Sequence, residues 1–358
     1  MSSVARVADL RAALGRLPRV PLAHLPTPLE PAPRLSSALG TTIYVKRDDL
    51  TGLALGGNKV RQLEYLLGEA VQAGATAVIS GAGLDSNHCR QIAAACAKLG
   101  LRACLILRGE RPARLEGNLL LDTIFGAECR FIPTERFYGE FEEIASGWAD
   151  ALSADGERPY LINTLGTDTH SVALAALGYV QAALELEEQF QTLGWRPDVA
   201  YFCSGAATQA GLTLARKSLD LPYRLVGISA SPFIPDKPTV IAQVAMRAAR
   251  LLDLDLTFHP TEITNEDAYI GVGYGALTLG SVAALRLAAR TEGLLLDPTY
   301  TAKALAGLVD HIRRGYVRPH EQVLFLHTGG APSVFLSRNE AIAPVGAQGT
   351  PEYPGPTR

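Results

Sequence analysis

Short β-branched segments alternate with longer alanine-rich segments along most of the chain, and this alternation restricts the folds that it can adopt. Strands are predicted for residues 42–46, 77–80, 102–107, 128–132, 199–203, 225–229 and 323–327. Helices are predicted for residues 59–72, 87–99, 117–125, 169–191, 208–218, 238–252, 277–291 and 301–315. Strand, turn and helix in regular succession imply parallel strands joined by right-handed crossovers. The pattern therefore predicts an α/β fold built on parallel sheets.

The composition is that of a protein with a substantial core and no extreme charge. Hydrophobic residues make up 47 % of the 358 residues and charged residues 19 %, which suits one large domain or two mid-sized ones. The net charge is −3 and no Lys/Arg block occurs, so neither nucleic acid nor an anionic membrane is an expected partner. No uncharged apolar run reaches the ~18 residues of a membrane helix, and the first residues do not form a secretory signal. A cytoplasmic protein is expected.

Cysteine and histidine spacing gives no sign of a metal site or of a disulfide framework. The cysteines are odd in number and lack CxxC spacing, so they are expected to be reduced apolar side chains: Cys89, Cys96, Cys104, Cys129 and Cys203. HExxH and paired Cys/His spacings are absent, so no metal is expected. Residues 341–358 are rich in Pro and Gly and are predicted to form a loose tail.

Three predicted turns follow strands and are rich in small residues: 81–86, 203–208 and 328–330. In open α/β sheets, ligands bind outside the carboxyl ends of the strands. We expect the three turns to converge on one crevice.

Lys59 is the first candidate for chemistry, because it opens a predicted helix directly after Gly56, Gly57 and Asn58. A solvated lysine is one interpretation, but a cation at a helix N-terminus is disfavoured by the helix dipole. The alternative is an amine that forms a Schiff base with an aldehyde cofactor, with the glycines allowing close backbone approach.

The segment 204–208 follows a predicted strand and opens a predicted helix, where successive backbone N–H groups can bind a phosphate. It lacks both the GK[ST] ending of a Walker A loop and the GxGxxG fingerprint. A phosphate bound here should belong to a smaller cofactor, unless the segment is an ordinary turn.

Ser86 and His88 allow a hydrolase interpretation, but a GxSxG nucleophile elbow is absent. Asp85 is either a general base or, as the favoured interpretation, the N-cap of the helix that follows. Tyr274 and Tyr300 lie in predicted turns, where aromatic rings usually pack on their own scaffold. Glycine on both sides of Tyr274 also frees the backbone to place its ring over a flat ligand.

With these residues assembled, the chain resembles the pyridoxal-phosphate (PLP) enzymes of the D-cysteine desulfhydrase / 1-aminocyclopropane-1-carboxylate (ACC) deaminase family, of fold type II. The resemblance runs from about residue 22 to 335. Its anchors are residues 25–29, 44–49, 56–61, 86–91, 176–179, 273–275, 297–300 and 327–330. It implies pyridoxal 5'-phosphate as cofactor, a small amino acid as substrate and a homodimer.

The resemblance also implies a two-domain enzyme with three-layer, parallel-sheet domains. Residues 60–163 would form a small domain, inserted into a larger cofactor-binding domain made of residues 1–59 and 164–340. The cofactor would lie between the two domains.

Each candidate residue acquires an expected role from the family. Lys59 would be the Schiff-base lysine and proton shuttle, and Asn87 the partner of the cofactor's ring oxygen. Ser86, Asn87 and His88 would contact the substrate, with Ser86 and His88 holding its carboxylate or assisting proton transfer. The phosphate would be bound by Ser204, Gly205, Ala206, Ala207 and Thr208.

The tyrosines and Thr301 complete the set. Tyr274 would lie near the ring face and Tyr300 near the substrate, both with catalytic roles. Thr301 would be the partner of the pyridine nitrogen. ACC deaminases that resemble this chain have glutamate there and Ser-Asn-Gln in place of Ser-Asn-His, so both positions favour the desulfhydrase branch. Gln62 stands where relatives often have a lysine aimed at the phosphate.

The expected reaction is α,β-elimination on a small amino acid, D-cysteine first, giving pyruvate, ammonia and sulfide. ACC deamination and elimination from a sulfonated substrate such as cysteate are alternatives within the family. A PLP-binding protein without turnover, and a hydrolase built on Ser86 and His88, are alternatives from other classes.

Overall fold

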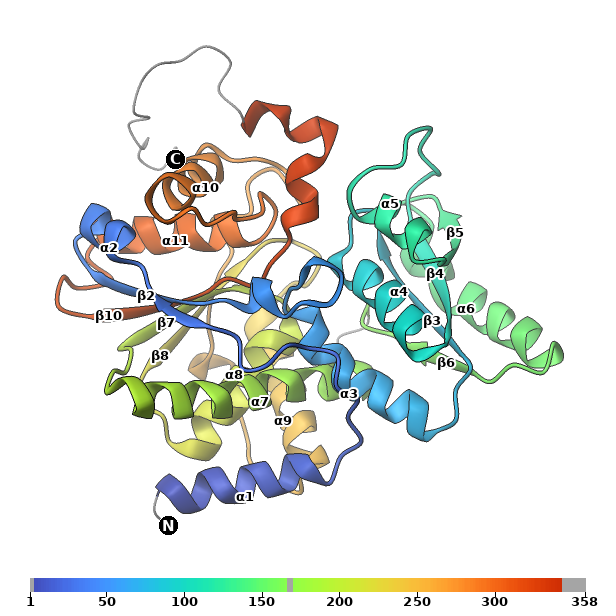
Figure 1. Ribbon diagram of the computed structural model, residues 1–358, viewed down its shortest axis with the longest axis horizontal. Helices are drawn as coiled ribbons and strands as arrows, with labels where there is room; N and C mark the ends of the chain where they lie inside the picture. Colours follow the sequence, from blue (N-terminus) through green and yellow to red (C-terminus); the bar gives the residue numbers. More distant parts are fainter. Residues whose placement is uncertain (1–2, 166–169, 343–358) are drawn as a thin grey trace.

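The computed structural model describes residues 3–165 and 170–342, and it shows two lobes side by side, each built on its own sheet (Figure 1). The larger sheet has the order β1-β2-β10-β7-β8-β9, and the smaller sheet has the order β5-β4-β3-β6. The strands of the larger sheet are β1 (Leu29–Pro31), β2 (Thr42–Lys46), β7 (Val199–Ser204), β8 (Arg224–Ser229), β9 (Thr264–Glu266) and β10 (Gln322–Leu326). Those of the smaller sheet are β3 (Ala77–Gly83), β4 (Arg102–Arg108), β5 (Glu128–Ile132) and β6 (Pro159–Ile162).

Apart from β1, which pairs antiparallel with β2, the paired strands run parallel, as the alternating pattern predicts. The α-helices are α1 (Ser3–Gly15), α2 (Pro33–Leu39), α3 (Lys59–Gln72), α4 (Asn87–Leu99), α5 (Gly117–Ile124), α6 (Phe137–Ala154), α7 (His170–Leu193), α8 (Ala206–Leu219), α9 (Lys237–Leu251), α10 (Leu279–Glu292) and α11 (Thr301–Arg313). Short 3-10 turns cover Asp48–Leu50, Leu53–Leu55, Pro260–Glu262, Ala331–Phe335 and Ser337–Ile342.

Each face of the larger sheet is covered by its own set of helices (Figure 1). Side chains alternate along a strand, so neighbouring residues of β10 serve different cores. Leu324 and Leu326 pack in the core formed with α7, α8 and α9, whereas Val323 and Phe325 pack with α2, α10 and α11. These buried strands are apolar on both faces, which is why they read as continuous hydrophobic runs.

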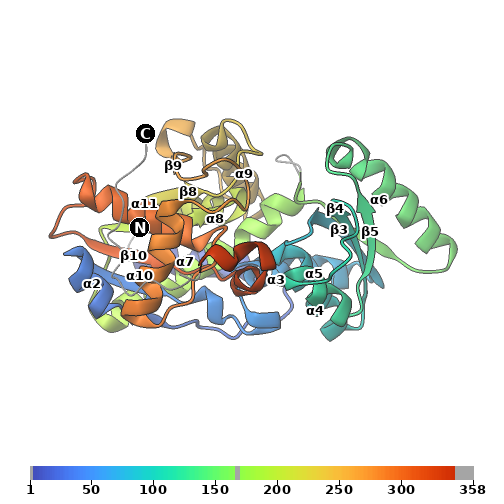
Figure 2. The same cartoon turned by 90° about the horizontal axis from the view of Figure 1, so that it is seen from above.

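The smaller sheet has the same three-layer construction, and Figure 2 shows its lobe from above. Ile79 and Ile106 pack against α6 on one face, while Val78 and Leu105 join the core shared with α3 and α4 on the other. Gly81 allows the close approach of α6, because a Cβ there would lie 2.6 Å from the Phe141 ring. The strand β3 pairs with β4 as far as Gly83, so the turn predicted at 81–86 begins too early.

Several elements were not predicted, namely α1, β1, α2, α6, β6 and β9. The predicted helix 169–191 has its first residue outside the described residues, and α7 itself begins at His170. Of the predicted tail, residues 343–358 also lie outside them. The domain boundary at residue 60 stays a prediction, since α3 contacts both α7 and α4. In the described ranges no helix is long and apolar enough to cross a membrane.

Candidate active site

Two adjoining cavities lie at the carboxyl ends of the strands, where residues of all three predicted turns meet. The smaller, of about 120 Å³, is lined among others by Asn58, Asn87, Cys203 and Thr328. The larger, of about 240 Å³, extends towards Arg108 and the aromatic residues around it. The residues shared by both linings are Lys59, Ser86, His88, Gly205 and Tyr300.

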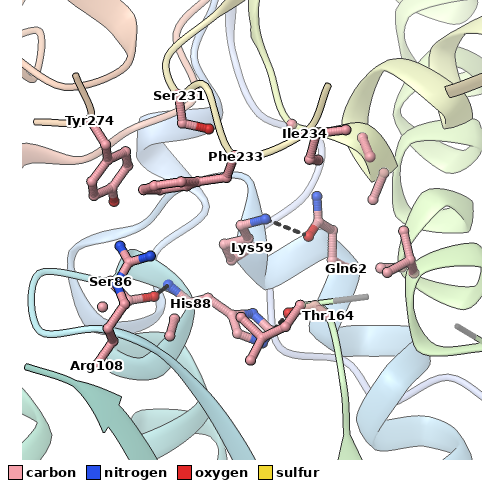
Figure 3. Close-up of a pocket in the computed structure, with 18 of the residues that line it drawn as sticks. Lys59, Gln62, Ser86, His88, Arg108, Thr164, Ser231, Phe233, Ile234 and Tyr274 are labelled. Atoms are coloured by element: carbon pink, nitrogen blue, oxygen red, sulfur yellow. Dashed lines mark hydrogen bonds between the residues drawn. The ribbon is translucent and has the colours of Figure 1, made fainter. Parts of the chain in front are cut away.

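Lys59 is the first residue of α3 and points into this space (Figure 3). The turn before it is fixed to the end of β10, since the Asn58 backbone N–H donates to the Thr328 carbonyl at 3.0 Å. Gly57 has φ +125°, and a Cβ there would lie 3.2 Å from the same carbonyl oxygen, so glycine is required. The Lys59 Nζ donates to Gln62 Oε1 at 3.1 Å. Burial lowers the pKa of Lys59 to about 8.

Ser86 caps α4, because its hydroxyl oxygen accepts from the backbone N–H groups of His88 at 3.1 Å and Cys89 at 3.3 Å. The cap interpretation of Asp85 is therefore wrong, and the Asp85 carboxylate instead forms an ion pair with Arg338. The Asp85 carboxylate therefore faces the C-terminal segment that carries Arg338.

Asn87 is held by its side-chain oxygen, which accepts from Arg90 Nη1 at 2.8 Å and from Asn118 Nδ2 at 3.1 Å. Among the described residues no acceptor contacts its amide nitrogen, so Asn87, which lines the smaller cavity, can donate to a ligand there. That arrangement suits the ring oxygen contact predicted for Asn87, which stays a prediction.

His88 is neutral, because burial and the nearby Lys59 ammonium lower its pKa to about 3. The His88 Nε2 lies 3.3 Å from Ser80 Oγ and 3.4 Å from Thr164 Oγ1. Ser80 donates its own hydroxyl proton to the Ile162 carbonyl at 2.7 Å, so we assign the imidazole proton to Nε2. Among the described residues Nδ1 has no partner, which leaves a buried acceptor at the cavity.

This geometry opposes a hydrolase built on Ser86 and His88. A serine nucleophile needs an imidazole at hydrogen-bond distance and a third group to orient that ring. The Ser86 oxygen is used in capping α4, and within the described ranges no carboxylate contacts the His88 ring.

Tyr274 and Tyr300 meet at the cavity, where their hydroxyl groups share a hydrogen bond and their ring centroids are 5.9 Å apart. Burial raises the pKa of Tyr274 to about 12, and burial together with Tyr274 raises the pKa of Tyr300 as well. Both side chains therefore remain phenols and act as hydrogen-bond partners.

The N-terminus of α8 opens onto both cavities through Gly205 and onto the larger one through Ala206 and Ala207. In the described part of the chain no side chain caps this helix, so its first N–H groups are available to an anion. Thr208 Oγ1 accepts from Asn58 Nδ2 at 3.2 Å and from Gln62 Nε2 at 3.1 Å.

Three residues of the predicted set lie outside both linings, namely Ser204, Thr208 and Thr301. The Ser204 hydroxyl donates to Gln209 Oε1 at 2.6 Å. The fully buried Thr301 donates to Asp297 Oδ1 at 2.7 Å, and its contact with a pyridine nitrogen stays a prediction.

Cys203, Thr328 and Arg108 line the cavities but were not singled out from the sequence. Each lies within two residues of the carboxyl end of a buried parallel strand, and this position is the signal that the sequence offers. Burial raises the pKa of the Cys203 thiol to about 12, so it stays protonated.

The chain matches the model of the pyridoxal-phosphate dependent enzyme family over residues 20–329. It is 38 % identical over 330 residues to the D-cysteine desulfhydrase of Klebsiella pneumoniae subsp. pneumoniae, covering 90 % of this chain and 97 % of that protein. It is 39 % identical over 337 residues to the D-cysteine desulfhydrase of Serratia proteamaculans, covering 91 % and 98 %. The chain belongs to the pyridoxal-phosphate dependent enzymes, and the predicted family is confirmed.

Solved structures agree with this assignment. The crystal structure of an ACC deaminase homologue matches with a TM-score of 0.83 and 36 % identity, covering 94 % of this chain and 99 % of that one. Threonine deaminase isoform 2 of Solanum lycopersicum matches with a TM-score of 0.61 and 15 % identity over 95 % and 87 % of the chains, which shows the fold alone. The predicted fold type II is confirmed.

The residues present fit pyridoxal phosphate. A lysine with a pKa near neutrality lies at the junction of the cavities, and the uncapped N-terminus of α8 offers N–H donors to a phosphate. Asn87 supplies a side-chain amide donor, and the unpartnered His88 Nδ1 supplies an acceptor.

Proposed function

We propose that this enzyme catalyses α,β-elimination on a small amino acid, with D-cysteine as the first candidate, to give pyruvate, ammonia and sulfide. The observation that carries the proposal is Lys59, a buried amine with a pKa of about 8, facing a neutral His88 and two phenols. The substrate assignment is supported by the D-cysteine desulfhydrases that the chain resembles over 90 % of its length. These relatives favour D-cysteine over ACC.

In this proposal the chain's residues divide the work between binding and proton transfer. Gly205, Ala206 and Ala207 hold the cofactor phosphate, and Asn87 donates to the cofactor ring. When bound, the cofactor withdraws electrons from the substrate's α-carbon. Lys59 then takes the α-proton on Nζ, for which a pKa near 8 is suited.

Ser86 holds the substrate carboxylate through its hydroxyl proton at the N-terminus of α4, where the helix dipole favours an anion. The imidazole of His88 stays neutral and its Nδ1 is an acceptor, so His88 assists proton transfer by accepting a hydrogen bond and carries no charge into the site. The paired phenols of Tyr274 and Tyr300 donate towards the departing group. Thr301 is retained as the proposed partner of the pyridine nitrogen.

The proposal is tested by assaying the holoenzyme with a D/L amino-acid panel and ACC, measuring pyruvate against 2-oxobutyrate, with sulfide as co-product. Lys59→Ala should lower kcat by about a hundredfold or more and should remove the borohydride-reducible attachment of the cofactor. Lys98→Ala, an exposed lysine on α4, is the matched control and should leave both unchanged.

Release of 2-oxobutyrate from ACC, without pyruvate from D-cysteine, would replace the proposed reaction by ACC deamination. A reducible cofactor without α-proton exchange on any amino acid would support a binding protein instead. We further propose a cytoplasmic homodimer with a small domain at residues 60–163, and sedimentation of the holoenzyme tests the dimer.

A further inference from the structure

Arg90 lies behind the smaller cavity, and the proposed mechanism gives it no role. It belongs to α4, about one helical turn after Asn87, and its side chain is fully buried. It lines neither of the two cavities. A buried guanidinium is unfavourable unless hydrogen bonds satisfy it, so the partners of Arg90 indicate what its charge does in this fold.

The guanidinium of Arg90 connects two parts of the site. Its Nη1 donates to Asn87 Oδ1 and to Asn118 Oδ1, each at 2.8 Å. Its Nη2 donates at 2.8 Å to the carbonyl of Gly56, in the turn that leads into Lys59. Arg90 therefore joins the turn before Lys59 to the residue that is proposed to contact the cofactor ring.

The amide of Asn87 has one favourable orientation in this arrangement. Its Oδ1 accepts from Arg90 and also from Asn118 Nδ2, at 3.1 Å. The Asn118 amide is fixed in turn, since its Nδ2 donates to the Asp85 carbonyl at 2.7 Å. Because two donors occupy its oxygen, Asn87 presents N–H groups, and not a carbonyl oxygen, to a ligand in the smaller cavity.

The positive charge of Arg90 has little compensation from the described residues. Burial lowers the pKa of Arg90 to about 10, so the guanidinium is still charged at neutral pH. Asp122 acts on it electrostatically, but burial raises the pKa of Asp122 to about 8, which leaves this carboxyl mostly protonated at neutral pH. Asp297 also acts on it, but its carboxylate accepts from the N–H groups of residues 299–301. The charge of Arg90 therefore polarises the Asn87 amide and strengthens its N–H donors.

We propose that Arg90 is a positioning residue that acts through Asn87: it directs the Asn87 amide donor at the ring oxygen of the cofactor and favours the ionised form of that oxygen. This inference rests on the proposed contact between Asn87 and the cofactor ring. A cation that acts through a polarised N–H donor stabilises an anionic oxygen more than a neutral hydroxyl. The ionised oxygen in turn holds a proton on the nitrogen that links the cofactor to Lys59, which is the form that an incoming amine displaces.

The test measures the bound cofactor directly and needs no turnover. Pyridoxal phosphate attached to a lysine absorbs at longer wavelength when its ring oxygen is ionised, so the ratio of the long-wavelength to the short-wavelength band reports this ionisation. In the Arg90→Gln holoenzyme the band ratio should fall about fivefold or more, and the Kd of pyridoxal phosphate should rise roughly threefold to tenfold. Arg90→Lys retains the charge and should recover part of the band ratio. Arg102→Gln, at the start of β4 and paired with Glu128 on the surface, is the matched control and should change neither quantity.

Variants of the two asparagines separate the charge of Arg90 from its role in packing. In an Asn87→Ala background, Arg90→Gln should cause no further fall in the band ratio, because the link to the ring oxygen is already absent. Asn118→Asp keeps Arg90 in place but puts a carboxylate beside its guanidinium, so it should lower the band ratio as Arg90→Gln does. Thermal unfolding of each apoenzyme checks the fold, and Asn118→Asp replaces Arg90→Gln if the latter is unfolded.

An unchanged band ratio in folded Arg90→Gln, or in Asn118→Asp where it replaces that variant, would overturn the inference. An equal further fall in the Asn87→Ala background would also overturn it, because Arg90 would then act on the cofactor by another route. If Asn87→Ala itself changes neither the band ratio nor the Kd, the proposed contact of Asn87 with the ring is refuted together with the inference. The expected band ratios without pyruvate from any amino acid would refute the proposed elimination and still support the role of Arg90.

Discussion

The protonation of Lys59 is governed by burial, since its hydrogen-bond partner is the neutral amide of Gln62. Burial disfavours the ammonium form, and it lowers the pKa of Lys59 from 10.5 to about 8. The glutamine bridges the amine and Thr208 Oγ1, so it orients the amine without adding a second charge. A lysine at position 62 would place a like charge beside Lys59.

The lowered pKa predicts how the apoenzyme takes up its cofactor. Attachment of the aldehyde requires the neutral amine, and the neutral form of Lys59 dominates above a pH of about 8. The rate of loading with pyridoxal phosphate should therefore rise with pH and level off above about 8. Absorbance followed after mixing, from about pH 6.5 to about pH 9.5, measures this rate.

Free Nα-acetyl-lysine amide is the control. It reacts with the same cofactor, so the ionisations of the cofactor itself affect both rates equally. Its rate should still be rising at the highest pH, because a solvated lysine has a pKa of about 10.4. Parallel profiles for the apoenzyme and the free amine would show that the folded chain does not lower the pKa of Lys59.

Single residues could be predicted from the sequence where a local motif places them. Lys59, Ser86 and His88 are of this kind, and all three line the cavities. Arg108 was missed as a cavity-lining residue, because its surroundings depend on rings brought from distant segments, such as Phe233. Asp85 was misinterpreted for a similar reason, since its partner Arg338 lies far along the chain.

At the scale of elements, helix α3 is anchored behind Lys59 by a buried ionic network. Arg61 donates to Asp48 Oδ1 at 2.8 Å and to Glu185 Oε2 at 3.0 Å, which joins α3 to the segment after β2 and to α7. Tyr179 also donates to Asp48, at 2.8 Å. Burial acts to raise the pKa of Asp48, but Arg61 together with Lys46 and Tyr179 outweighs burial and holds this pKa below its usual value.

Replacement of Arg61 should therefore destabilise the fold more strongly than replacement of an exposed arginine. Arg61→Ala leaves Asp48 and Glu185 buried with less compensation, and we expect a loss of about 3–5 kcal/mol in the free energy of unfolding. Urea denaturation measures it. Arg136→Ala, which removes an exposed pair with Glu140 on α6, is the control and should leave the midpoint unchanged. Similar midpoints for the two variants would contradict a structural role for the network.

Element types were predictable wherever apolar periodicity was strong, and the long buried helices and strands follow it. Strands β1 and β9 have 3 residues each, too few for a period to be visible. They are strands because a neighbouring strand pairs with them, as β2 does with β1 in the register of Lys46 opposite Leu29. The helix α6 was missed although it spans 18 residues, and its buried Phe141 and Trp148 lie on one face.

At the scale of the whole molecule, the sequence indicates parallel sheets but not the position of each strand. The last strand, β10, lies between β2 and β7, so residues from both ends of the chain meet at the cavities. Such pairing is a long-range property that no local pattern encodes. The C-terminal 3-10 turn also reaches the smaller lobe, where Ser337 donates to Glu116 at 2.8 Å through both its N–H and its hydroxyl.

The ion pair between Asp85 and Arg338 is part of the same connection between lobes, and it neutralises a carboxylate close to the substrate site. Asp85 precedes Ser86 and acts electrostatically on Tyr274.

Arg338→Ala should expose this negative charge of Asp85 to an anionic substrate and raise KM by about twofold to fivefold with little change in kcat. Asp85→Asn added to Arg338→Ala should restore KM, because the repelling charge is then removed as well. Added salt should reduce the effect in the single variant. A KM that stays high in the double variant would mean that Arg338 acts by positioning the C-terminal turn. An unchanged KM in Arg338→Ala would mean that the charge of Asp85 does not reach the substrate.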